Sequence, residues 1–123
     1  MTIHMTDKEN INLVVRNYVE GMIFADEALL RQAFHPSCCV IGHYHGELEW
    51  LSLDDFISAI KAEGPAAKDV TPFWEMDDID ITGDAAAVKV RDDYIGMRFT
   101  DYLSLLKTDH RWMIVNKLYY YHE

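Results

Sequence analysis

The stretch RWMIVNKLYYY (residues 111–121) has the composition of a buried β-strand, and this strand indicates how the rest of the chain must fold to cover it. More than half of its side chains are β-branched or aromatic, the types that favour strands. Side chains alternate between the two faces of a strand, so strict alternation divides the stretch in two. One face carries Val115, Lys117, Tyr119 and Tyr121, and the other carries Trp112, Ile114, Leu118 and Tyr120. A strand that is apolar on both faces needs cover on both.

Helices of the same chain can cover only one of these faces. In a chain of 123 residues, the simplest cover for the other face is a second copy of the chain. We therefore expect a homodimer through the outer face of the sheet, formed by Ile41, Trp112, Ile114, Leu118 and Tyr120. A tightly curled sheet that hides its own outer face is the alternative.

The residues that precede this strand read as further strands joined by short turns. Residues 70–82, 85–94 and 100–108 have the period of two that is typical of strands. Gly83-Asp84 and Asp109-His110 have the composition of turns between them. The second half of the chain is therefore predicted to be a meander of strands, with one earlier strand over residues 38–44.

The first half of the chain predicts three helices. Thr6-Asp7-Lys8-Glu9 is a capping-box pattern that opens the first helix. Asp26 is positioned to cap a short second helix, and Ser52 a third that ends at Gly64-Pro65. Helices followed by a strand meander indicate an α+β fold. We expect a single domain over residues 1–123, a cone-shaped, curved and mostly antiparallel sheet with three helices from the N-terminal half on its concave face.

Charge and composition exclude several classes of partner. The formal net charge is −10, from 11 basic and 21 acidic residues, and no Lys/Arg cluster stands out. Nucleic acids and anionic membranes need such a cluster, so neither is an expected partner. Residues 1–10 have no apolar signal core, and the adjacent Cys38 and Cys39 are expected to be free thiols. These features predict a cytoplasmic protein.

The order of these elements resembles the nuclear transport factor 2-like superfamily, also described as cystatin-like in fold. Within it, the chain is most similar to the SnoaL-like group that is often labelled "putative lumazine-binding". The stretches that carry the resemblance are Phe34-His35-Pro36, Gly46-Glu47-Leu48, residues 99–103 and residues 112–117. The resemblance implies a conical fold with an internal pocket, whereas it leaves activity open because such folds hold many functions.

The resemblance also implies which side chains line the pocket. Ketosteroid isomerase, an enzyme of this superfamily, has an oxyanion-binding tyrosine that falls at Tyr18 and a protonated aspartate that falls near Tyr102. Its general-base aspartate falls at Gly42, which has no side chain to act as a base. Steroid-type isomerase activity is therefore not expected. The expected ligand-binding residues are Tyr18, Met22, Phe34, Val40, Tyr44, Trp74, Tyr94, Tyr102, Val115, Lys117 and Tyr119.

Lys117 is the most informative of these residues because a lysine on an inward face is costly unless it is paired or reaches water. Asp92 shares a face with Val90 and Tyr94, so it is a candidate partner if that face also points inward. A structural pair, or a lysine that extends to solvent at the mouth of the cone, is the alternative. The candidate catalytic residues are Tyr18, Tyr102, Lys117 and Asp92.

The function expected from these residues is binding of an unknown small organic ligand. If the protein is an enzyme, we expect isomerase or lyase chemistry on a small cyclic carbonyl compound, without a metal or an organic cofactor. The alternative is a non-catalytic dimeric module that binds another protein. A cavity of roughly 300 Å³ or more at Tyr18, Tyr102 and Lys117 would favour the first, and a cone filled by Trp74, Phe34 and Met22 the second.

Overall fold

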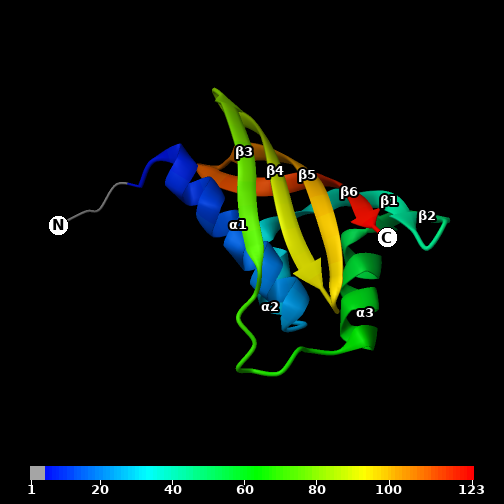
Figure 1. The fold of residues 1–123 in the computed structure, drawn as a ribbon. Helices are drawn as coiled ribbons and strands as arrows, with labels where there is room; N and C mark the ends of the chain where they lie inside the picture. The colour runs from blue at the N-terminus through cyan, green and yellow to red at the C-terminus, as the bar shows by residue number, and fades with distance from the viewer. Residues whose placement is uncertain (1–4) are drawn as a thin grey trace.

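A computed structural model describes residues 5–123, and this part of the chain forms three helices and six strands (Figure 1). In chain order these are α1 (Asp7–Ile23), α2 (Glu27–Ala33), β1 (Phe34–Tyr44), β2 (Glu47–Ser52), α3 (Leu53–Glu63), β3 (Trp74–Thr82), β4 (Ala85–Tyr94), β5 (Met97–Thr108) and β6 (Arg111–His122). The expectation of one domain over residues 1–123 stays a prediction, and its first four residues lie outside the described part.

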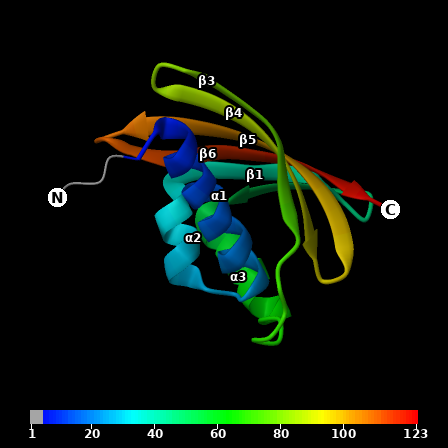
Figure 2. The same ribbon diagram turned by 60° about the vertical axis from the view of Figure 1, so that its left-hand side comes forward.

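The six strands form one curved sheet in the order β2-β1-β6-β5-β4-β3. Neighbouring strands are antiparallel except for β1 and β6, which are parallel. The three helices lie together against the concave face of the sheet, and the opposite face is left without helices (Figure 2). The predicted α+β fold, a mostly antiparallel cone with its helices on one face, is confirmed.

The helices begin where the capping residues of the sequence predicted. Thr6 and Glu9 form the capping box of α1, in which the Thr6 hydroxyl accepts from the Glu9 backbone N–H at 3.1 Å. The side chains of Asp26 and Ser52 cap α2 and α3 by accepting from a backbone N–H three residues on. Gly64 follows α3 with φ of 82°, a conformation that glycine adopts without strain.

The strand β2 was not predicted from the sequence, in which Trp50 was expected in the loop before the third helix. His45 and Gly46 both have positive φ angles and join β1 to β2 as a two-residue hairpin. The strand directs Glu49 and Leu51 toward the cavity and leaves Leu48 and Trp50 exposed, so apolar side chains lie on both of its faces. Such a strand has no consistently apolar inner face by which the sequence would mark it.

A β-bulge interrupts the alternation of β6. Ser104 of β5 pairs with Asn116 of β6, and the next residue of β5, Leu105, pairs with Ile114. Val115 is therefore an extra residue without a partner in the ladder. An extra residue of this kind turns the following side chains over to the other face.

The bulge corrects the sequence-based division of β6 into two apolar faces. Trp112 and Ile114 were expected on the outer face, but both are buried against the helices. Lys117 and Tyr119, on the other side of the bulge, are buried on the same inner face. The large side chains of both halves of β6 thus join one core, and Leu118 and Tyr120 are the outward apolar residues that remain of the expected β6 set.

Two further sequence-based expectations concern the environment of the chain. No helix within residues 5–123 is long and apolar enough to cross a membrane. Cys38 and Cys39 are both free thiols, as their adjacency predicted. Burial raises the pKa of the Cys38 thiol to about 11.

Deletion of Val115 tests the role of the bulge. Without the extra residue, strict alternation would move Trp112 and Ile114 into solvent, and burial of each such side chain contributes about 1.5–3 kcal/mol. We expect the deletion to lower the free energy of unfolding in urea by more than about 3 kcal/mol. Val115→Ala keeps the residue count and is the control, with a loss below about 1.5 kcal/mol. A deletion variant as stable as Val115→Ala would contradict this account.

Candidate functional site

A cavity of about 220 Å³ lies between the helices and the concave face of the sheet. Its walls come mainly from α3, β1, β2, β4 and β6. Its lining includes Met22, Val40, Tyr44, Glu49, Phe56, Asp92, Tyr94, Phe99, Lys117 and Tyr119. Two larger surface hollows, of about 410 and 470 Å³, contain none of the buried ionisable residues. The smaller, largely apolar cavity is therefore the candidate site.

Asp92 is the most unusual residue of the cavity wall. Its side chain is 0% exposed, and neither carboxyl oxygen has a hydrogen-bond partner among the described residues. Burial, followed by the nearby carboxyl group of Asp101, raises the pKa of Asp92 well above its usual range. Lys117 acts in the opposite direction, but it is the weaker influence. Asp92 is thus a carboxyl group suited to holding or moving a proton.

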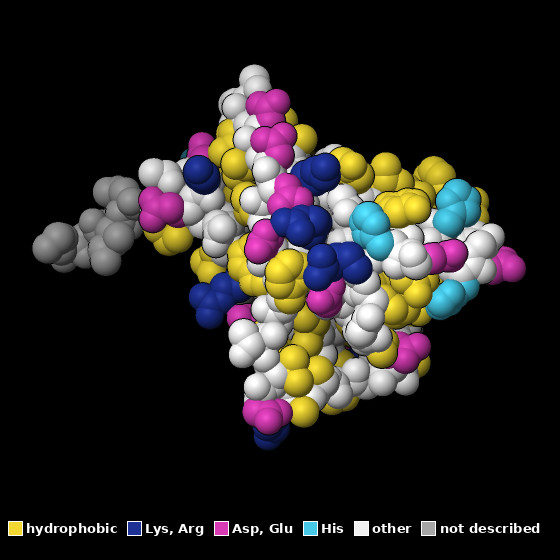
Figure 3. All heavy atoms as spheres, viewed as in Figure 1, with side chains coloured by type: hydrophobic (Ala, Val, Ile, Leu, Met, Phe, Trp, Pro, Cys, Tyr) yellow, Lys and Arg dark blue, Asp and Glu magenta, His cyan; other side chains and the backbone are white. Residues whose placement is uncertain are grey.

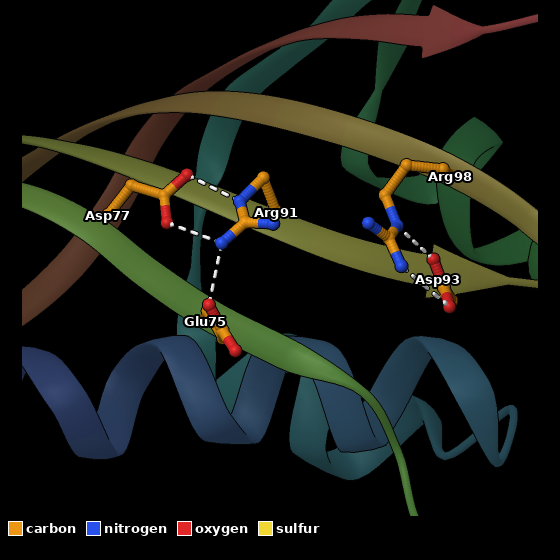
Figure 4. A network of polar contacts seen from close by, with 5 residues as sticks. All are labelled: Glu75, Asp77, Arg91, Asp93 and Arg98. Carbon is orange, nitrogen blue, oxygen red and sulfur yellow. Dashed lines mark hydrogen bonds and ion pairs between the residues drawn. The ribbon is translucent and has the colours of Figure 1, made fainter.

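The charged side chains of Arg91 and Asp93, on either side of Asp92 in β4, face away from the cavity. Arg91 binds Asp77 and Glu75 of the neighbouring strand, with distances of 2.7 and 2.6 Å to their nearest oxygens (Figure 4). Arg98 binds Asp93 in the hairpin that joins β4 to β5 (Figure 4). Because alternate side chains of a strand face opposite ways, both arginines neutralise carboxylates of the outer side. The buried carboxyl group between them receives no arginine.

A second buried acid, Asp101, lies behind the cavity wall. The Tyr18 hydroxyl donates a hydrogen bond of 2.7 Å to it, and both side chains are fully buried. Burial and then the Asp101 charge raise the pKa of Tyr18 well above its usual value, so the phenol keeps its proton. Helix α1 and strand β5 are therefore joined by a charge-assisted hydrogen bond inside the core.

Lys117 brings a positive charge into the same region. Its side chain is 5% exposed, and its Nζ lies 4.7 Å from the ring centres of Tyr18 and Phe56 and 5.5 Å from that of Tyr119. Within hydrogen-bonding range it has the Met22 sulfur, a weak acceptor, at 3.9 Å. No carboxylate of residues 5–123 lies within ion-pair distance of this amine. Aromatic faces thus surround the amine in place of a counter-ion.

The position that corresponds to the isomerase's general base is closed. A Cβ atom on Gly42 would lie 2.7 Å from the Tyr119 ring and 2.7 Å from the Tyr119 carbonyl oxygen. The Tyr119 hydroxyl extends across the cavity and donates to Glu49 of β2. A side chain at residue 42 would therefore collide with this tyrosine, and any acid–base chemistry must come from another strand.

The sequence-based list of site residues is partly realised in the geometry. The cavity is lined by Met22, Val40, Tyr44, Tyr94, Lys117 and Tyr119 from the expected ligand-binding set, together with the catalytic candidate Asp92. Tyr18 lies beside them, with its ring against the Lys117 amine. Burial raises the pKa of the Tyr94 hydroxyl to about 12, so this group also remains protonated at neutral pH.

Five residues of that list do not line the cavity, and one of them, Tyr18, lies beside it. Phe34 packs in the core with its ring centre 5.4 Å from that of Tyr18, Trp74 is half-buried at the start of β3, and Val115 forms the bulge. Tyr102 is 49% exposed on the outer face. The placement of Tyr102 at the pocket was wrong because its neighbour Asp101 takes the inward position.

Asp101, which lies behind the cavity wall, and several cavity residues were missed by the sequence analysis. Asp101 alternates with Phe99 and Leu103, which are both buried, and this pattern could have identified it as inward. The contributions of β2 and α3 were missed because β2 was not predicted; they are Glu49, Leu51, Phe56, Ala59, Ile60 and Glu63. In residues 5–123, no group of three or more histidine, cysteine or acidic side chains is arranged to hold a metal ion.

The fold, with a cavity between the helices and the concave face of the sheet, is that of the nuclear transport factor 2-like class of α+β proteins. A family model described as "Putative lumazine-binding" matches residues 6–120, which is nearly the whole chain. The protein belongs to this family.

Solved structures and one curated protein extend the comparison. A nuclear transport factor 2-like protein of unknown function from Silicibacter pomeroyi is 35% identical, with a TM-score of 0.87 over 96% of this chain and 100% of that one. A similar protein of unknown function from Shewanella baltica is 28% identical, with a TM-score of 0.85 over 100% and 99% of the two chains. The aldolase FrzH of Cladobotryum sp. is 25% identical over 98% of this chain and 97% of its own.

Replacement of Asp92 tests whether the pKa of its carboxyl group is raised in the folded protein. The folded protein keeps a proton on Asp92 to a higher pH than the unfolded chain does, so stability falls as the pH rises above about 4 toward the folded pKa. Asp92→Asn has no such titration. We expect its Tm to exceed the wild-type Tm by about 3 °C or more near pH 8, and the difference to shrink toward pH 4.

The matched control is Asp93→Asn, one residue along the same strand, where the carboxylate is paired with Arg98. This variant should show no gain that increases with pH. Tm values from circular dichroism across the pH range decide the matter, and an Asp92→Asn effect that is independent of pH would contradict the assignment.

Proposed function

We propose that the cavity binds a small cyclic carbonyl compound and that Asp92 transfers a proton at the carbon next to its carbonyl group. One observation carries the proposal: a fully buried carboxyl group with a raised pKa and no protein hydrogen bond lines the cavity. An acid in this state is matched to proton transfer near neutral pH. The reaction class is that of an isomerase or lyase, and Asp92 needs neither a metal nor an organic cofactor to perform this step.

The cation opposite this acid supports the same chemistry. Removal of a proton next to a carbonyl places negative charge on the carbonyl oxygen, and a positive charge in a dry cavity stabilises it strongly. Lys117 lines the same cavity and has no protein carboxylate as an ion-pair partner among residues 5–123. Tyr94 offers a further hydroxyl donor from the same strand as Asp92.

The size and walls of the cavity restrict the ligand. The cavity volume of about 220 Å³ is smaller than the roughly 300 Å³ that the sequence analysis expected of a ligand pocket, and Tyr102 does not line it. The space restricts the ligand to a compound of one or two small rings. Phe56, Phe99 and Tyr119 give it flat aromatic walls that suit a ring. Similarity to a protein named as an aldolase supports carbon–carbon lyase chemistry, because an aldol reaction also begins with loss of a proton beside a carbonyl.

Exchange of hydrogen for deuterium tests the proposal without knowledge of the natural substrate. Cyclohexanone and cyclohexane-1,3-dione in heavy water are suitable probes, with the loss of their α-proton signals followed by NMR. We expect the wild-type protein to accelerate exchange and Asp92→Asn to reduce that acceleration by about 100-fold or more. Asp93→Asn should retain it within about twofold. Failure of the wild-type protein to bind or exchange any cyclic carbonyl compound would contradict the proposal.

We also propose that the chain forms a homodimer through the outer face of the sheet, alongside its ligand-binding function. Trp50, Ile41, Leu118 and Tyr102 form one row of paired outward positions across β2, β1, β6 and β5. Trp50 is 66% and Leu118 47% exposed, and Tyr120 is also exposed in the next row. Figure 3 shows charged side chains along β3 and β4, with hydrophobic side chains and histidines beside them. A row of this kind suits association between copies of the chain.

Leu118→Glu tests this interface. A charge in the middle of the apolar row would have to be buried in a dimer, so we expect a dimeric wild-type protein and a folded, monomeric variant at micromolar concentration. Ser104→Glu on the same face, outside the row, is the control and should remain dimeric. Analytical ultracentrifugation measures the mass, and a monomeric wild-type protein would overturn the interface.

A further inference from the structure

The position of Lys117 within the cavity indicates a role beyond stabilising negative charge on a bound carbonyl oxygen. A lysine side chain that is 5% exposed carries an amine that water cannot solvate freely, and protein interiors ordinarily pair such an amine with a carboxylate. Here the amine contacts three aromatic rings and a methionine sulfur. The amine thus lines the cavity with no carboxylate of residues 5–123 within ion-pair distance, and a bound ligand would give it a polar partner.

Three ionisable side chains form a diagonal across three neighbouring strands. Asp101 of β5 pairs with Val90 of β4 and with Tyr119 of β6. Asp92 and Lys117 each lie two residues from these partners and face the same side of the sheet. Diagonal neighbours are separated by about 7–8 Å at the backbone, within reach of long side chains. Asp92 and Lys117 therefore line one cavity with an acid between them on the central strand.

The charges of this group balance when it holds one shared proton. Two carboxyl groups and one amine carry no net charge if the amine is an ammonium and one carboxyl group is protonated. Such a group supplies a proton donor and a proton acceptor within the same cavity. An amine becomes a nucleophile when a neighbouring carboxylate takes its proton, and desolvated lysines serve this role in covalent catalysis.

We propose that Lys117 forms an iminium (Schiff base) bond with an aldehyde or ketone bound in the cavity, and that Asp92 relays the protons of that step. This inference rests on the proposed function, because it specifies how the same cavity activates a carbonyl compound.

The step balances in atoms and charge. When the shared proton of the group lies on Asp101, Asp92 is a carboxylate and takes one proton from the Lys117 ammonium. The free amine then forms a carbon–nitrogen bond as the carbonyl electron pair moves to oxygen. The nitrogen loses a second proton, and the oxygen leaves as water with both protons. An ammonium and a carbonyl compound thus become an iminium ion and one water molecule. Asp92, again a carboxylate, then accepts the α-proton, and a neutral enamine forms.

The surroundings of the amine favour this cation. The rings of Tyr18, Phe56 and Tyr119 present aromatic groups to the nitrogen, and an iminium carries the same positive charge as the ammonium that it replaces. The apolar walls slow the return of water that would hydrolyse the bond. Small aldehydes and ketones are therefore the ligand class that this site suits, and those with an α-hydrogen would go on to form the enamine.

Reductive trapping tests the inference on the wild-type protein. The protein is incubated with cyclohexanone or benzaldehyde and sodium cyanoborohydride, which reduces an iminium to a stable secondary amine. Intact-mass and peptide mass spectrometry locate the adduct. We expect Lys117 to be modified at least tenfold faster than any surface lysine. Modification of surface lysines alone would overturn the inference.

Variants separate covalent from electrostatic roles. Lys117→Arg keeps the charge but cannot form the iminium bond, so it should lose both trapping at residue 117 and α-proton exchange, with its fold checked by circular dichroism. Lys68→Arg, in an exposed loop, should change neither. Exchange that persists in Lys117→Arg and depends on Asp92, with no adduct at Lys117 in the wild type, would refute the covalent step and leave the proposed function standing. An adduct without exchange would do the reverse.

Discussion

One extra residue in the last strand allows a single layer of helices to cover this sheet. Val115 lies outside the ladder, so Trp112 and Ile114 on one side of it and Lys117 and Tyr119 on the other all face the helices. Without that shift, half of the large side chains of β6 would need a second cover. The same shift brings a lysine and a tyrosine to the cavity while the far end of the strand fills the apolar core. The packing of the core and the position of the cavity residues on β6 therefore both depend on the β-bulge at Val115.

The helices and the fold class could be predicted because their signals are local. A capping residue such as Thr6 or Ser52 acts within one turn, and the structure places both where the sequence indicated. The face on which a strand residue lies is predicted instead by counting alternate residues along the strand. One bulge therefore exchanges the predicted inner and outer faces for every residue beyond it. Trp112 and Ile114, before Val115, were therefore assigned to the outer face but lie on the inner one. The inward positions of Lys117 and Tyr119 were correct because the alternation was counted from their side of the bulge.

The candidate site was predictable in part for the same reason. Asp92 and Tyr94 follow the regular alternation of β4 and both line the cavity, whereas the sequence left open which way Asp92 faces. Tyr102 was chosen over Asp101 because the resemblance was carried over one residue out of register. Strand β2 was not predicted because it has apolar side chains on both faces, with Glu49 inward and Trp50 outward. Such mixed faces occur where a polar side chain serves a cavity, and composition alone does not show them.

The close contact between Gly42 and Tyr119 has a consequence for how this site could have diverged from its relatives. A carboxylate at residue 42 and the aromatic ring at residue 119 compete for one volume, so the two arrangements of acid and base exclude each other within a single cavity. A Cβ at residue 42 would also meet the Tyr119 backbone carbonyl oxygen at 2.7 Å, which no exchange at residue 119 removes. A carboxylate at residue 42 therefore requires a shift of β6 relative to β1 as well as a smaller side chain at residue 119, and a single exchange at either position produces a collision or a void.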